Sequence, residues 1–220
     1  MAVVLGSGAT ARADSLTFSF NQANIWSGGA PADTSTWLTA TFTDTGVNTV
    51  SLTLSASGPW QDSKGNVIRI DNVYFNLDPH LTSLLSGGLT FGRVSGPAAS
   101  IIIGEDVAKA DGDGFYDIFL NYGNSFPSGS SAKFTITGTG ISASSFDFLS
   151  TENKTSNYGP FDAAIHLTGY NDNGGSAWVY GSPTSSATPD GGSTIGLLGL
   201  ALISMGLMRR KGLLKKADLG

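Results

Sequence analysis

The strongest constraint on the fold of this chain is a repeated alternation of apolar and polar residues over short runs. Leu16–Phe20, Leu38–Phe42 and Val50–Leu54 each alternate with a period of two, which places successive side chains on opposite faces of a β-strand. Further strand-like runs follow, at Val67–Leu77, Ile101–Ile103, Phe115–Leu120, Lys133–Thr137, Ala164–Thr168 and Ala177–Tyr180. Because clusters of Gly, Asn, Asp and Pro separate these runs, the sequence predicts an all-β fold.

Residues 14–181 are long enough for one domain with a sizeable core. Short strands divided by turn residues are typical of sandwiches and barrels, and we expect a single β-sandwich of jelly-roll type. The run Val67–Leu77 is the longest and is expected to bend or bulge near Asp71–Asn72. Short helical turns are expected at Leu81–Leu85 and Ala143–Leu149.

Composition excludes several classes of site. The chain has no cysteine, so it holds no disulfide, thiol nucleophile or thiolate metal site, and packing alone must stabilise the domain. The formal net charge is −5 although the last residues are basic, so the region before them is clearly acidic. An acidic domain is a poor partner for nucleic acid, because phosphate contacts need clustered Lys and Arg.

The C-terminal region contains an apolar run, residues 195–208, whose one polar residue is Ser204. As a helix this run reaches about 21 Å, and residues 191–194 extend it to roughly the minimum for a membrane span. A buried core helix is the alternative for so short a run, but this run is apolar on every side. Arg209, Arg210 and Lys211 follow at once, and positive charge beside a span marks the cytoplasmic side.

We therefore expect a single apolar transmembrane helix at 195–208, with a basic cytoplasmic tail at 212–220 and the domain outside the cytoplasm. A turn-forming motif precedes the helix, and its residues are Pro189, Asp190, Gly191, Gly192, Ser193 and Thr194. Proline disfavours helix before it, and glycines keep the backbone open enough to enter a protease cleft. Residues 182–188 form a polar, flexible linker that holds this motif clear of the domain.

The motif, the apolar helix and the basic triplet, in this order over residues 189–211, resemble a PEP-CTERM sorting signal in its VPDGGST-like variant. Thr188 stands where that family usually has an apolar residue, and residues 212–220 follow the triplet. The resemblance implies an exosortase-like membrane protease as partner. It also implies transient anchoring in the inner membrane, followed by cleavage and delivery to the cell surface or the exopolysaccharide matrix.

The domain itself resembles, more loosely, the ectodomains common among PEP-CTERM proteins. The segments that carry this resemblance are 49–54, 73–79, 110–117 and 134–138. Most such ectodomains lack an assigned activity, so the resemblance bears on fold and location more than on function.

Residues 1–13 look like the back half of a secretory signal peptide. Ala11 and Ala13 form an A-x-A cleavage site around Arg12, which gives a mature start at Asp14. Because the basic region that opens a signal peptide is missing, we expect a start codon further upstream. A disordered N-terminal tail is the alternative.

Two candidate binding sites emerge within the domain. Asp111, Asp113 and Asp117 could supply oxygen ligands for Ca²⁺, although Asp-Gly pairs are also ordinary hairpin turns. Trp26 and Trp60 look loop-borne and could stack on sugar rings, although aromatic residues more often fill the core of a β-sandwich.

The sequence offers little for catalysis. His80 and His166 are the only histidines, and Gly-x-Ser-x-Gly is absent, so no nucleophilic triad is recognisable. The leading hypothesis is a non-enzymatic, exported structural protein of the cell surface or exopolysaccharide matrix. A carbohydrate-binding, lectin-like module with the same tail is the alternative, and a glycosidase using paired carboxylates ranks third.

Overall fold

The computed structural model describes residues 14–23, 36–61, 64–110, 114–152, 159–169 and 175–184. All of them belong to one unit, residues 13–186. No helix within these ranges is long and apolar enough to cross a membrane. The predicted transmembrane helix at 195–208 lies outside the described residues.

Eleven strands and two short 3₁₀ helices make up the described fold, which confirms the all-β prediction. The strands are β1 (Ser15–Ala23), β2 (Leu38–Gly46), β3 (Thr49–Ala56), β4 (Arg69–Phe75), β5 (Thr90–Ser95), β6 (Ser100–Lys109), β7 (Gly114–Pro127), β8 (Ser131–Thr137), β9 (Thr151–Glu152), β10 (Ala163–Thr168) and β11 (Ser176–Pro183). The 3₁₀ helices are η1 (Pro79–Ser86) and η2 (Ala143–Phe146). The turn expected at Leu81–Leu85 lies within η1, and η2 forms the first part of the turn expected at Ala143–Leu149, whereas β5 and β9 were not predicted.

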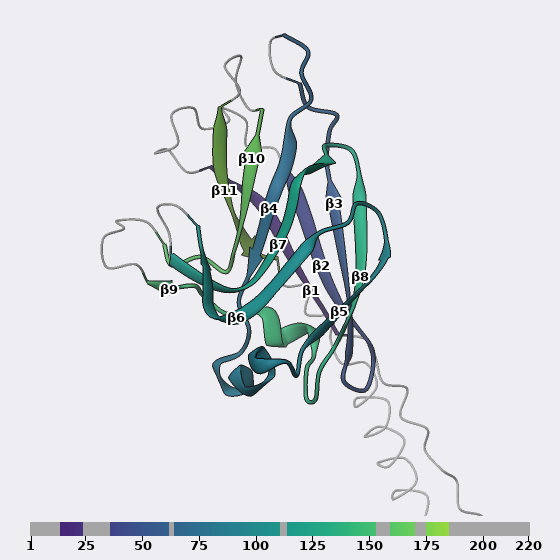
Figure 1. Cartoon of the computed structure of the whole chain (residues 1–220), viewed down its shortest axis with the longest axis vertical. Helices are drawn as coiled ribbons and strands as arrows, with labels where there is room; N and C mark the ends of the chain where they lie inside the picture. Colours follow the sequence, from purple (N-terminus) through teal and green to yellow (C-terminus); the bar gives the residue numbers. More distant parts are fainter. Residues whose placement is uncertain are drawn as a thin grey trace, which may run out of the picture. The chain divides into compact units, whose positions relative to one another are not determined.

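All strands pair in one antiparallel sheet rather than in two separate ones. Their order is β5-β8-β3-β2-β1-β11-β10-β4-β7-β6, with β9 beside the start of β7. The two end strands, β5 and β6, follow each other in the chain and are joined by residues 96–99 only (Figure 1). The sheet is therefore nearly closed and approaches a barrel.

Phe75 on β4 shows how strongly the sheet curves. Its ring lies 5.0 Å from that of Phe42 on β2 and 6.0 Å from that of Phe18 on β1. Strands β1, β11 and β10 lie between β2 and β4 in the sheet, so a flat sheet would separate those two strands by about 19 Å. The contact requires the sheet to curl around an interior filled by the apolar face of each strand.

The two 3₁₀ helices close one end of this interior. The ring of Phe146 in η2 stacks on Phe42 at 4.2 Å and 15°, and the backbone N–H of Ala143 donates to Asp44 Oδ1 at 2.6 Å. Leu84 and Leu85 of η1 are also buried. A hydrogen bond and an aromatic stacking contact thus fix η2 against β2, beside the hairpin that joins β2 to β3.

Gly96, at the start of the link between β5 and β6, is a position where only glycine fits. Its φ is +82°, and a Cβ there would lie 2.1 Å from the carbonyl oxygen of Ser131 on β8. Gly65 is a matched control, because its φ is +83° but nothing lies within 4 Å of its Cβ position.

We expect Gly65→Ala to cost about 1–2 kcal/mol, from the left-handed backbone alone, and Gly96→Ala to cost clearly more, because β8 must also move. Chemical denaturation of both variants measures the two free energies of unfolding. Equal losses would show that the link does not pack against β8 as described.

Candidate functional site

Strand β4 carries a β-bulge at Asp71. In its pairing with β10, Asn72 lies opposite His166 and Ile70 lies opposite Leu167, so Asp71 has no partner between them. The pairing with β7 is interrupted at the same place. This confirms the irregularity predicted near Asp71–Asn72, and bulges of this kind redirect a side chain out of the regular alternation.

The face of β11, β10, β4 and β7 that points away from the core holds two neighbouring rows of side chains. Residues paired across antiparallel strands lie side by side on one face, so the register defines each row. The covered row is Tyr180, Ala164, Tyr74 and Phe119, and the open row is Trp178, His166, Asn72 and Asn121. Alternate residues such as Val73, Phe75 and Ile165 face the core.

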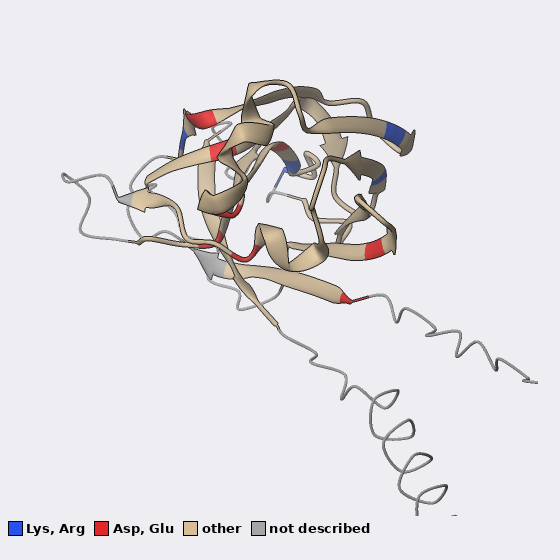
Figure 2. Cartoon of the chain, turned by 90° about the horizontal axis from the view of Figure 1, so that it is seen from below, with Lys and Arg blue, Asp and Glu red and all other residues tan. Residues whose placement is uncertain are grey.

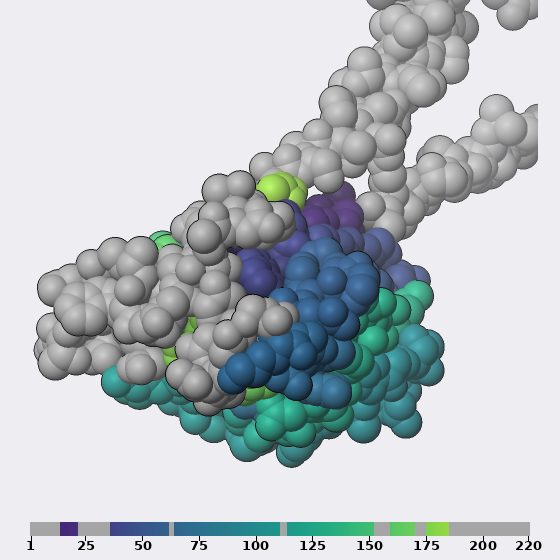
Figure 3. All heavy atoms as spheres, turned by 90° about the horizontal axis from the view of Figure 1, so that it is seen from above, coloured from purple at the N-terminus to yellow at the C-terminus, as the bar shows by residue number. Residues whose placement is uncertain are grey.

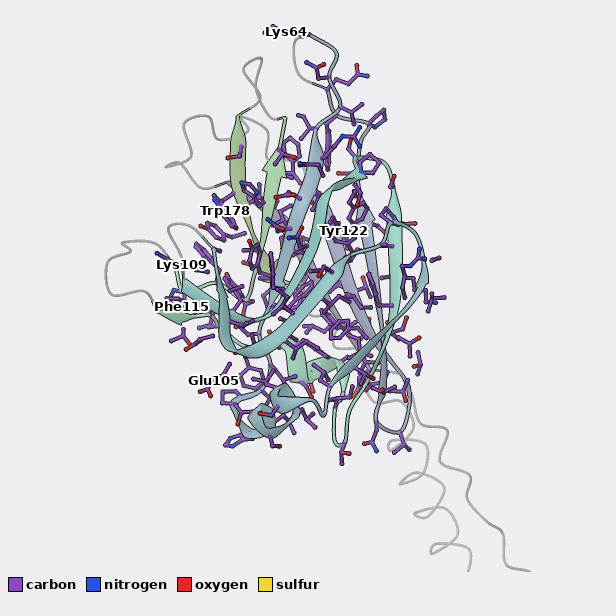
Figure 4. All side chains as sticks on the ribbon, viewed as in Figure 1. Lys64, Glu105, Lys109, Phe115, Tyr122 and Trp178 are labelled. Atoms are coloured by element: carbon purple, nitrogen blue, oxygen red, sulfur yellow. The ribbon has the colours of Figure 1, made fainter. Side chains whose placement is uncertain are left out.

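A flap, residues 104–110 with 114–117, lies over the covered row. Between Ile103 and Ala108 strand β6 bulges away from β7, and Asp117 lies opposite this bulge. Ala108, Ala110 and Tyr116 then pack with Tyr74 and Tyr180 in a second apolar cluster, separate from the main core. Figure 4 shows the flap residues Lys109 and Phe115 on the same flank of the domain as Trp178.

Asp117 holds the flap in place. Its side chain is buried, with Oδ1 accepting the backbone N–H of Asp106 at 3.0 Å and Oδ2 accepting that of Leu77 at 3.1 Å. Burial raises the pKa of this carboxyl, and the charges of Asp106 and Glu105 raise it further. The two backbone hydrogen bonds lower the pKa but do not cancel the rise. The carboxylate thus ties the bulge of β6 to the end of β4.

This role bears on the predicted Ca²⁺ site. Asp111 and Asp113 lie outside the described residues, while both carboxylate oxygens of Asp117 already accept backbone hydrogen bonds. No group of three or more His, Asp or Glu is gathered for a metal in the part of the chain that the structure describes.

The open row combines an indole ring with a polar cluster. Asp71 Oδ2 lies 3.3 Å from His166 Nδ1 and accepts the Asn72 Nδ2–H at 2.9 Å, while Oδ1 accepts the backbone N–H of Asn124 at 3.0 Å. The ring of Trp178 lies 4.7 Å from His166 and 5.4 Å from Tyr74. The side chains of His166 and Asp71 remain 19% and 21% exposed.

Tyr74 links the two rows. Its ring packs on Phe119 at 5.0 Å and on Tyr116 at 5.7 Å. Burial, and to a lesser extent the charge of Asp71, raises the pKa of the Tyr74 hydroxyl. A hydrogen bond with the Asn72 side chain partly offsets this rise in the pKa. Tyr74 therefore stays neutral and serves as a rigid floor between the aromatic cluster and the polar one.

Trp60, one of the two tryptophans predicted to lie in loops, is not part of the open row. Trp60 is partly buried against the core, with its ring 4.3 Å from that of Trp37. Its backbone N–H donates to Ser128 Oγ at 2.9 Å. It thus packs on Trp37 from within the connection between β3 and β4, which is drawn in blue in Figure 3. Trp26 lies outside the described residues.

The remaining predicted residues are placed as follows. His80 is exposed in η1, where its backbone N–H donates to Asp78 Oδ1 at 2.8 Å. Asp162 and Asp147 lie close enough for their charges to interact, and burial, followed by Asp147, raises the pKa of Asp162. The described Lys and Arg residues are scattered singly (Figure 2). Ala11, Ala13, the motif at 189–194 and the triplet at 209–211 lie outside the described residues.

Sequence reasoning overlooked the open row. Trp178 and His166 sit on separate strands, and only the register of β10 against β11 brings their rings together. The signal available was weak: both residues occupy polar-facing positions of alternating runs. Chemically, the row offers one broad apolar ring beside amide, imidazole and carboxylate groups, a combination that suits binding of a polyhydroxyl compound.

Comparison with protein families, with curated proteins and with solved structures finds no match for this chain.

The buried Asp117 carboxyl, whose pKa is raised, makes the stability of the fold depend on pH in a testable way. Because its pKa is higher in the folded than in the unfolded protein, this carboxyl stabilises the fold fully below about pH 4, and the contribution is lost as pH rises through the folded pKa. Asp117→Asn removes the titration and sets an amide NH₂ against one buried N–H, at a cost of about 1–3 kcal/mol.

The free-energy gap between wild type and Asp117→Asn should therefore be widest near pH 4 and narrow toward pH 7, as measured by urea denaturation across that range. Asp78→Asn, at a more exposed turn, is the control. A gap that widens with rising pH would mean that the two backbone bonds outweigh burial.

Proposed function

We propose that this chain is an exported, non-catalytic protein of the cell surface or exopolysaccharide matrix, processed by an exosortase-like membrane protease at Pro189–Thr194. In this proposal the all-β ectodomain precedes the linker 182–188, the apolar helix 195–208 and a basic cytoplasmic tail. The support is the order of linker, motif, apolar run and basic triplet. It is the order that a sorting signal needs, because cleavage must fall between the cargo and the membrane span.

The observation that favours this proposal within the described fold is the position of the two chain ends. β1 and β11 are antiparallel neighbours, with Phe18 opposite Pro183. The backbone N–H of Thr184 donates to Thr17 O at 2.6 Å, and that of Asp44 donates to Asp14 O at 3.0 Å. The domain thus begins and ends at the same end, so both proposed cleavages would remove segments from one side of it.

Chain length limits where the protease can act. From Thr184 to Pro189 a fully extended chain reaches at most about 18 Å. Thr184 is held to β1 by its backbone and by its Oγ1, which donates to Thr17 O at 3.1 Å. The cut must therefore fall close to the end of the domain that holds the β2–β3 hairpin, and the linker supplies the only slack.

Intact-mass analysis of the protein secreted by its native host tests this proposal. We expect a C-terminus between Pro189 and Ser193 in the wild type. Pro189→Ala combined with Asp190→Ala should block processing and leave the protein in the membrane fraction. A wild-type protein in the matrix that still ends at Gly220 would contradict the proposal.

Thr188→Val is the matched control for that double variant. It changes the residue before the motif to an apolar one without altering the motif, so processing should be at least as complete as in the wild type. Loss of processing here would indicate that the linker, rather than the motif, is recognised.

A carbohydrate-binding module with the same tail is the second candidate function, and the open row favours it. Trp60, whose ring packs on Trp37, is a weaker candidate for sugar stacking than Trp178. The latter lies in a row that also contains His166, Asn72 and Asn121.

A further inference from the structure

We propose that the open row, Trp178, His166, Asn72 and Asn121 with Asp71 beside it, binds a neutral hexose polysaccharide. The inference rests on the second candidate function and names its site and ligand class. It does not depend on the sorting tail. Three properties of the row carry it: a half-buried aromatic ring at the edge of the second apolar cluster, polar groups with hydrogen-bonding capacity to spare, and a local charge balance unlike that of the whole chain.

The ring comes first. Trp178 is half-buried, and its orientation is fixed by His166 at 4.7 Å and Tyr74 at 5.4 Å. A ring that already packs against two neighbouring rings needs little further ordering when a ligand arrives, which lowers the entropic cost of binding. Its apolar face is chemically suited to the C–H face of a pyranose, as aromatic rings bury apolar surface beside a polar rim.

The polar groups follow the ring across the sheet: His166 lies one strand away from Trp178, Asn72 two strands away and Asn121 three. Asp71 Oδ1 accepts a hydrogen bond from the backbone N–H of Asn124 at 3.0 Å, and a carboxylate oxygen can accept two. Asn72 Oδ1 is buried with no hydrogen-bond partner among the described residues, so a small turn of this amide would offer it to a hydroxyl. Asn121 is exposed, and its Oδ1 accepts the backbone N–H of Gly123 at 2.8 Å. Sugar hydroxyls both donate and accept, and they match this mixed set.

Charge selects a neutral ligand over an anionic one. Asp71 is the acidic group of the row, and Arg69 lies close by, since its Nη1 donates to Asn124 O at 3.4 Å and Asn124 N donates to Asp71. The charges of Asp71 and Arg69 offset each other locally, whereas the formal net charge of the whole chain is −5. A uronic-acid polymer would meet repulsion from the acidic domain, and Arg69, balanced by Asp71, does little to offset it.

The dimensions fit a polymer better than a single sugar. The row crosses β11, β10, β4 and β7, a width of about 14 Å at the usual strand spacing. On one side the flap covers the neighbouring row, where the ring of Phe161 stacks on Tyr180 at 4.1 Å and 10°. Thr168, next along β10, donates its hydroxyl to Asn124 Oδ1, so the other side is polar.

Affinity electrophoresis of the full-length chain in mild detergent tests the proposal. Native gels would contain hydroxyethyl cellulose, dextran or galactomannan as neutral polymers, and alginate as the anionic one. We expect retardation by at least one neutral polymer and none by alginate. Trp178→Ala should weaken that binding about tenfold or more, and Asn121→Ala, at an exposed position, several-fold.

Trp60→Ala is the matched control, because it removes the same side chain from a site that packs on Trp37, and it should leave the dissociation constant unchanged. Thermal unfolding identifies any variant that does not fold. If Trp178→Ala does not fold, the binding of Asn121→Ala tests the proposal in its place. The proposal is overturned if no neutral polymer retards the wild type, if alginate alone does, or if both row variants bind normally. Absence of polysaccharide binding would not change the position of the C-terminus found by intact-mass analysis. Failure of this proposal is therefore distinguishable from failure of the sorting proposal.

Discussion

The packing of Phe75 against Phe42 and Phe18 is the contact on which the described fold depends. It joins strands that lie far apart in the order of the sheet, so it exists only when the sheet curls on itself. Once the sheet is curled, the apolar face of every strand meets an interior instead of solvent, and burial of that face supplies the main driving force for folding. Without cysteines, no covalent link shares this task.

Curling also creates the second face on which the candidate site lies. Strand β7 is longer than its neighbours: over Ile118–Asn121 it pairs with β4 and with β6, and its first two residues pair with β9. Asp117 marks the point where its partner β6 bulges, and its carboxylate joins that bulge to Leu77. The flap formed in this way buries Tyr74 and Tyr180, whereas Trp178, His166 and Asp71 remain partly exposed. One buried carboxylate thus separates a covered aromatic cluster from an accessible row.

Much of this arrangement could be predicted from sequence, because strand formation is written locally in period-two alternation. The bulge at Asp71–Asn72 was also visible, as an interruption in an unusually long run. Strand β5 could not be predicted in this way. Most of its residues are exposed at the edge of the sheet, so its sequence does not alternate between buried and exposed positions. Trp60 was predicted to lie in a loop, and it does lie between β3 and β4, but the packing of its ring on Trp37 is a tertiary contact that the local sequence does not indicate. The open row depends on the register of four strands, which no local pattern encodes.

The indole N–H signals of the four tryptophans provide the most direct test of the central claim, that the open row is the ligand-binding surface. Titration of the isotope-labelled protein with neutral gluco-, manno- and galacto-oligosaccharides should shift the Trp178 signal and the amides of Asn72 and Asn121. The signals of Trp37 and Trp60 should stay in place. Shifts of Trp37 and Trp60 without Trp178, or no shift with any of these sugars at millimolar concentration, would contradict the account.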